Sequence, residues 1–288
     1  MNKTYLLVVI TLLLNGCVSK GTSYNDQWSK AKNLTVAGGM TRQVHDQQLA
    51  AGAYNKEGLL LDYKLNSLFH PAYGNFSGIT GGSMAPSGAF KSFYWGWNIP
   101  GASHRSNHRL FAWMPKNNAK DKLHAKQLLE GMVAKSAVTV LEEMQFKLQP
   151  VKTPYVYLGT AFQQWYIEDS DGDCSFQRMN CMLSIYIPEP ESSVVAPSFS
   201  FYATAVQDAW LFNISDQFNY PRIALSQGGP KKTIAENVFY QKLSVRLPGW
   251  TYLYMAPDRV AIGENNETIS YPYILEKGKP LLFIRPVK

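Results

Sequence analysis

Long hydrophobic runs are absent from this 288-residue chain beyond its first 16 residues. No later apolar run approaches the roughly 18 residues typical of a transmembrane helix. The sequence also lacks a phosphate-binding glycine loop, a Walker motif and a His-Glu-x-x-His zinc motif, and it holds only five histidines. Internal repeats and low-complexity tracts are missing too. These absences favour a globular domain and remove the commonest sequence signals of nucleotide hydrolysis and zinc catalysis.

Acidic residues are absent from positions 63–120, although the chain has 21 of them. The same stretch carries six basic side chains and many aromatic rings. We interpret part of it as a surface for an anionic lipid, a glycan or the acidic face of a protein. The alternative is that the basic side chains lie on several different faces of the domain and that the aromatic side chains lie in its core. The residues expected to form this surface are Lys91, Trp95, Trp97, His104, Arg105, His108 and Arg109.

The first 16 residues have the layout of a signal peptide, with Lys3 ahead of about ten apolar residues. As a helix that run would reach roughly 15 Å, half the hydrocarbon thickness of a bilayer. The run ends in Leu14-Asn15-Gly16-Cys17, which resembles the lipobox of bacterial lipoproteins. This resemblance implies cleavage before Cys17 and acylation of its sulfur. The residue after the acylated cysteine is Val18 and not Asp, which by the same resemblance implies that the protein is delivered to the outer membrane. An ordinary secretory peptide with an incidental cysteine is the alternative.

The resemblance also sets the expected domain organisation. Residues 1–16 are the signal peptide, 17–27 a flexible tether, and 28–288 a single β-rich globular domain with a possible subdivision near 150. Removing the signal peptide leaves 27 basic against 21 acidic side chains, a net charge of +6. The domain is expected on the periplasmic side or at the cell surface, where stable binding of nucleic acid is not expected.

Cysteine is scarce, and only Cys174 and Cys181 remain once Cys17 is acylated. An even pair in an oxidising compartment predicts one disulfide. Two buried free thiols are the alternative.

The pattern of apolar residues predicts an α+β fold, a sandwich- or barrel-like β domain with one long amphipathic helix over about 119–147. Asn117 or Asn118 is the expected cap of that helix. Residues 238–247 and 251–255 are among the predicted strands, because they are rich in β-branched and aromatic side chains.

An acidic loop follows one of the predicted strands. Its carboxylates at Asp169, Asp171 and Asp173 alternate as in a loop that wraps Ca²⁺, although an EF-hand glycine and glutamate are missing. We therefore expect no resident cofactor and treat calcium as a weak alternative to a solvated hairpin loop. The loop could also dock on the basic surface of this chain or of another copy.

These observations favour a non-enzymatic binding or assembly component of a cell-envelope complex of the secretion, pilus or conjugation type. An envelope hydrolase acting on glycan or lipid is an alternative, with its carboxylates drawn from Glu168 and the three aspartates of the acidic loop. A carbohydrate-binding module that stacks sugars on Trp95 and Trp97 is another.

Overall fold

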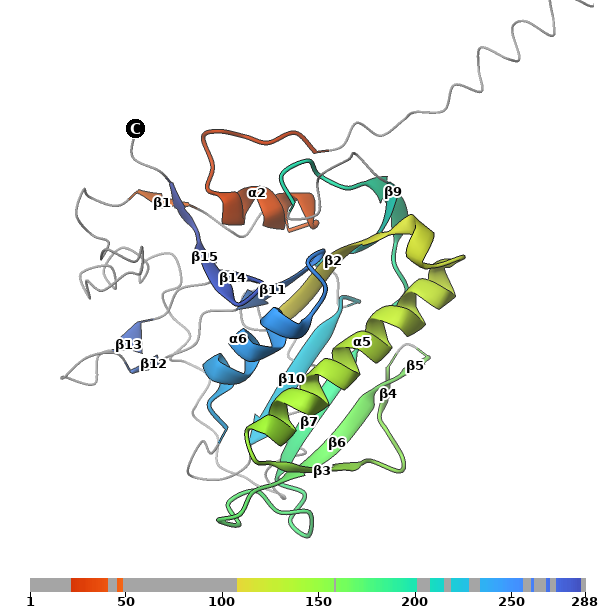
Figure 1. The fold of residues 1–288 in the computed structure, drawn as a ribbon, viewed down its shortest axis with the longest axis vertical. Helices are drawn as coiled ribbons and strands as arrows, with labels where there is room; N and C mark the ends of the chain where they lie inside the picture. Colours follow the sequence, from red (N-terminus) through yellow and green to blue (C-terminus); the bar gives the residue numbers. More distant parts are fainter. Residues whose placement is uncertain are drawn as a thin grey trace, which may run out of the picture.

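The computed structural model describes residues 22–40, 46–48, 108–157, 159–200, 208–214, 219–227, 234–255, 260–261, 268–269 and 273–285. Over these residues the protein is a mixed α and β structure, with two larger antiparallel sheets and three α-helices (Figure 1). The α+β class predicted from the sequence is therefore confirmed.

The larger sheet has six strands, and every neighbouring pair in it is antiparallel. In spatial order its strands are β15 (Lys279–Leu282), β14 (Tyr273–Glu276), β11 (Thr251–Met255), β2 (Arg109–Pro115), β9 (Asp208–Phe212) and β8 (Ser192–Val195). Strand β2, which belongs to the acid-free stretch, lies at its centre and is paired on both edges, with β11 and with β9.

The smaller sheet has four antiparallel strands. In spatial order they are β10 (Arg222–Gln227), β7 (Cys181–Tyr186), β6 (Gln163–Glu168) and β3 (Lys147–Pro150). The two sheets meet where the amide of Leu110 donates to the carbonyl of Pro221 at 3.0 Å. Three short pairs complete the described strands: β1 (Gln47–Gln48) with β16 (Ile284–Arg285), β4 (Val156–Tyr157) with β5 (Thr160–Ala161), and β12 (Val260–Ala261) with β13 (Thr268–Ile269).

Helices α5 (Lys122–Glu143) and α6 (Glu236–Arg246) lie side by side on one face of the sheets (Figure 1). Helix α2 (Lys30–Ala37) covers the other face of the six-stranded sheet. Alternate residues of β2 consequently enter different cores. Leu110, Ala112 and Met114 pack under α5 and α6, while Phe111 and Trp113 pack with α2.

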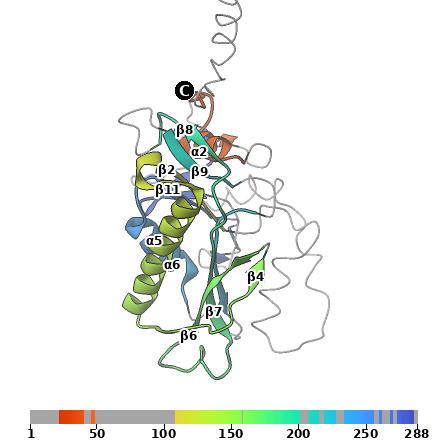
Figure 2. The ribbon, with the colours of Figure 1, turned by 90° about the vertical axis from the view of Figure 1, so that its right-hand side faces the viewer.

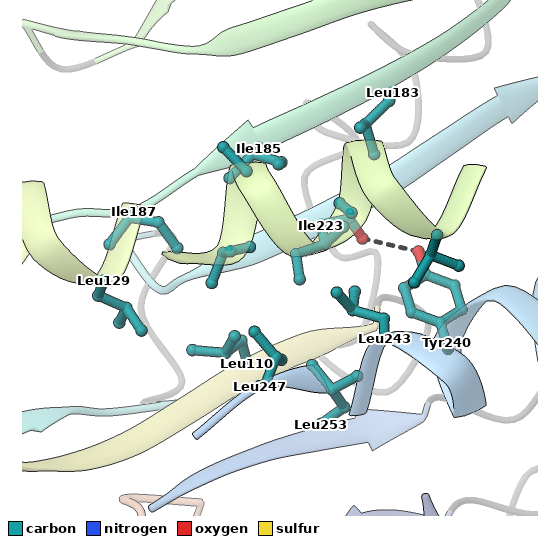
Figure 3. Packing of buried hydrophobic residues seen from close by; sticks show 14 of the residues in the cluster. Leu110, Leu129, Leu183, Ile185, Ile187, Ile223, Tyr240, Leu243, Leu247 and Leu253 are labelled. Carbon is teal, nitrogen blue, oxygen red and sulfur yellow. Dashed lines mark hydrogen bonds between the residues drawn. The ribbon is translucent and has the colours of Figure 1, made fainter. Parts of the chain in front are cut away.

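The main core fills the space between the two helices and both sheets (Figure 3). Helix α5 contributes Leu129, β7 contributes Leu183 and Ile185, and α6 contributes Leu243. The hydroxyl of Tyr240 donates to the carbonyl of Ile223 at 2.8 Å, which ties α6 to β10. Burial, with a smaller contribution from the charge of Glu236, raises the pKa of Tyr240 well above its usual value, so this donor keeps its proton.

The prediction of a strand over 238–247 is wrong, because this segment lies almost entirely in helix α6. Its buried residues are Phe239, Tyr240, Leu243 and Ser244, a spacing that places all four on one helical face. In a strand, Phe239 and Tyr240 would point to opposite faces. Packing against two sheets therefore outweighs the β propensity of the local sequence.

The cap predicted for the long helix is also wrong. The side chain of Asp121, and not Asn117 or Asn118, accepts a hydrogen bond from the amide of His124 at 2.8 Å. Residues Lys116–Asn118 form a short 3-10 turn, η2, before it. At the other end, Gln145 has a φ of 69°, and its amide and that of Phe146 close the last turn.

The β14–β15 hairpin turn is fastened to the end of α6. Lys277 and Gly278 both have positive φ, 49° and 79°, as a two-residue hairpin turn of type I′ requires. The ammonium of Lys277 donates to the carbonyls of Val245 and Leu247 at 2.7 Å, where helix carbonyls otherwise lack partners. The amide of Gly278 donates to the hydroxyl of Ser244 at 3.1 Å.

We expect Gly278→Ala to destabilise the protein by about 2 kcal/mol, from backbone strain at positive φ together with a steric clash. A Cβ at this position would lie 2.5 Å from Cγ2 of Val245. The matched control is Gly131→Ala in α5, where a Cβ would meet nothing within 4 Å. Because alanine has a higher helix propensity than glycine, we expect this control substitution to stabilise the protein by up to about 1 kcal/mol. Urea denaturation measures both, and equal effects would contradict the described turn.

Candidate functional site

Most of the predicted anion-binding surface lies outside the described residues. This applies to Lys91, Trp95, Trp97, His104 and Arg105, and Cys17 lies outside them as well. The prediction for these residues therefore stays a prediction.

The two members of that surface that the structure describes, His108 and Arg109, are not freely exposed. His108 is half-buried, with its ring 4.8 Å from that of Tyr240. Arg109 is only 1% exposed, and its Nη1 donates to the carbonyl of Ile214 at 3.2 Å. Its guanidinium carbon lies 4.0 Å from the ring centre of Tyr220, and that of Arg222 lies 4.4 Å from the same ring. Arg109 is therefore an interior residue and cannot contribute to an exposed surface, contrary to the expectation for it.

Trp113 is also buried, and its ring packs edge-on against the stacked rings of Phe111 and Tyr252. It offers no exposed face on which a sugar could stack.

The predicted disulfide between Cys174 and Cys181 is confirmed. Both cysteines are buried in the main core, and their Cα atoms are 5.3 Å apart. The bridge closes the connection from β6 to β7. This connection, residues 168–181, is called the disulfide loop below.

Asn180 organises the inside of the disulfide loop. Its side-chain oxygen accepts from the amide of Ser175 at 3.0 Å, and its amide nitrogen donates to the carbonyl of Asp173 at 2.6 Å. The amide of Met179 donates to the carbonyl of Ser175 at 2.9 Å. One covalent bond and three hydrogen bonds thus restrict a loop of fourteen residues, which lowers the entropy it would lose on binding.

The acids of the disulfide loop point to different environments. Glu168 faces Lys147 across the β3–β6 pair, with 3.9 Å between Oε2 and Nζ. Both carboxylate oxygens of Asp169 are shielded from solvent and accept no hydrogen bond from the described residues. Asp171 is exposed and accepts from the hydroxyl of Ser170 at 3.2 Å, while Asp173 is half-buried.

A calcium site would need these oxygens to converge. Among the residues that the structure covers, no group of three His, Cys, Asp or Glu side chains is placed to hold a metal ion. Asp169, Asp171 and Asp173 alternate in sequence but do not form such a group.

Met179 is the feature of the disulfide loop that sequence reasoning missed. It is 53% exposed and has a φ of 49°, so an apolar side chain is held outward on an unusual backbone. Exposed methionine is common at binding surfaces because its flexible thioether adapts to varied pockets. Its position two residues before the second cysteine of a short ring was the available signal.

The disulfide loop lies at one end of the long axis of the molecule, and α2 lies near the other end (Figures 1 and 2). The loop carries four acidic residues and one basic residue, Arg178, a net charge of −3. It is the best candidate for a contact with another protein, because one short loop carries both an exposed apolar side chain and a net negative charge.

None of the described helices is both long enough and apolar enough to cross a bilayer. Comparisons with protein-family models, with curated proteins and with solved structures found no match.

Proposed function

We propose that this protein is a lipoprotein of the outer membrane, held through Cys17, that acts as a non-enzymatic binding or assembly component of a cell-envelope complex of the secretion, pilus or conjugation type. In this proposal the folded part is a rigid, sandwich-like body. The disulfide loop is its contact with the rest of the complex.

The buried disulfide is the observation that carries the proposal. Disulfides persist in the periplasm and at the cell surface but are rare in the cytosol. The Cys174–Cys181 bridge therefore supports export, which the signal-like first 16 residues predict independently. A lipid on Cys17 would then confine the domain near a membrane, because two or more acyl chains give stable anchoring.

The structure also suggests which chemistry the partner offers. Met179 favours an apolar pocket and the acids of the same loop favour basic groups, so we propose that the partner is an envelope protein with a basic, concave face. The loop's internal bonds fit this role, because a preorganised loop loses little entropy when it docks.

The experiment has two parts. Growth with radiolabelled palmitate should label the wild-type protein and leave Cys17→Ser unlabelled, and the variant should move from the membrane to the soluble fraction. A photo-crosslinking residue at Met179 should then give a discrete adduct with one envelope protein in intact cells.

The matched control places the same crosslinker at Leu123, which is 52% exposed on α5. This position should give no adduct of the same mass. Palmitate labelling of Cys17→Ser would overturn the anchor, and equal crosslinking from both positions would overturn the role of the disulfide loop.

A further inference from the structure

The chain enters the folded domain through a fixed turn. The buried side chain of Asn33 donates to the carbonyls of Asn25 and Ser29, both at 3.0 Å, and accepts from the amide of Asn25 at 2.8 Å. The amide of Trp28 donates to the carbonyl of Asn25 at 3.0 Å. The point at which the predicted tether ends is therefore rigidly attached to α2.

Helix α2 is in turn locked to the sheet. The ammonium of Lys30 donates to both carboxylate oxygens of Glu276 in β14, at 2.6 and 2.8 Å. Asp46 accepts from the amide of Ser29, which caps the helix, at 2.7 Å. The orientation of the entry turn thus fixes the orientation of the whole domain.

Two aromatic side chains lie on this entry turn, and each is contacted by a residue from outside it, Phe199 or Lys32 of α2. Tyr24 is 42% exposed, and its ring packs edge-on against that of Phe199 with centres 5.2 Å apart. The ammonium of Lys32 lies 4.5 Å from the ring centre of Trp28, and both residues are half-buried. Tyr24, Trp28, Lys32 and Phe199 are called the entry surface below.

The entry surface lies within a short reach of Cys17. Six residues separate Cys17 from Tyr24. The distance from Cys17 to Tyr24 is at most about 25 Å when the chain is fully extended and about 15 Å when it is flexible. Tyrosine and tryptophan favour the boundary between lipid headgroups and water, and lysine is attracted by anionic headgroups.

We propose that the entry surface rests on the phospholipid surface to which Cys17 is attached, and that it holds the domain with α2 toward the bilayer and the disulfide loop away from it. This inference rests on the proposed acylation of Cys17. It adds an orientation, because a tether alone would let the domain rotate freely.

The test uses the full-length, acylated protein in vesicles of phosphatidylethanolamine and phosphatidylglycerol. A cysteine at Gln27, which is exposed on the entry turn, and one at Met179 are labelled separately with an environment-sensitive dye. Brominated lipids should quench the dye at Gln27→Cys severalfold more strongly than the dye at Met179→Cys. Equal quenching at the two positions would overturn the proposal.

A second variant separates the entry surface from the tether. Tyr24→Ser with Lys32→Gln should leave flotation with the vesicles unchanged, because the acyl chains remain, while quenching at position 27 falls to the level at 179. Leu123→Ser is the matched control and should change neither. Unchanged quenching in the double variant would overturn the proposed contact of the entry surface with lipid, but not the proposed acyl anchor. Failure of the wild type to float would overturn the proposed anchor and this inference with it.

Discussion

Phe239→Ala is expected to lower the free energy of unfolding by about 3–5 kcal/mol. Phe239 is fully buried in α6, within the core that joins both helices to both sheets, and its ring lies 5.0 Å from that of Tyr240. Truncation removes the buried ring and leaves a cavity that the surrounding sheets can fill only in part. Since domains are stable by only about 5–15 kcal/mol, urea denaturation should show a large shift of the midpoint.

The neighbouring Val238→Ala is the matched control. Val238 is 37% exposed on the same helix, so its truncation should cost about 0.5 kcal/mol or less. A small effect of Phe239→Ala, or an equal effect of the two substitutions, would contradict the buried face described for α6.

Replacing Cys174 and Cys181 together by serine is the second substitution with a large expected effect, a loss of about 2–5 kcal/mol. Closing a ring of this length contributes about 2.5 kcal/mol on the chain-entropy estimate, and burying two hydroxyls in the main core adds a desolvation cost. The measurement is urea denaturation of the double variant beside the wild type.

Wild type treated with a reductant supplies the control for the disulfide. Reduction should reproduce most of the destabilisation without introducing buried hydroxyls. Trypsin should also cleave after the exposed Arg178 much faster in the double variant than in the wild type, because the loop can then open. Identical stability and identical cleavage rates would show that the bridge does not hold the loop.

Local sequence patterns were sufficient to predict those features that depend on nearby residues alone. The disulfide was predicted from the two cysteines that remain if the first residues act as the signal that they resemble, and the structure has it. The strand at Thr251–Met255 was predicted from its β-branched and aromatic residues, and β11 occupies it. Helix α5 lies within the segment predicted to be helical. Its cap was misassigned because Asn117, Asn118 and Asp121, three residues that can each cap a helix, lie close together in the sequence.

Local rules failed where packing decides between two conformations. Residues 238–247 were predicted as a strand from their β-branched and aromatic side chains, but a short apolar segment of this kind also fits a buried helix. The strands β9 and β10 and the short helix α2 were not predicted from the sequence.

Some residues of the candidate site could also be identified from the sequence, whereas the positions of others depend on the fold. Sequence identified the acidic residues of the disulfide loop, but the outward position of Met179 depends on the hydrogen bonds of the folded loop. Arg109 looked like a surface cation because arginine is rarely buried. Its burial against Tyr220 is decided by the place of β2 at the centre of the larger sheet.

The α+β class and the pairing of Cys174 with Cys181 could be predicted without a structure, because they depend on hydrophobic periodicity and on the number of cysteines. The helix at 236–246, and the positions of the disulfide loop and α2 toward opposite ends of the molecule, became apparent only in the folded chain (Figures 1 and 2). The physical reason is that burial is a property of elements packed together, and residues distant in sequence decide which face of each element is covered.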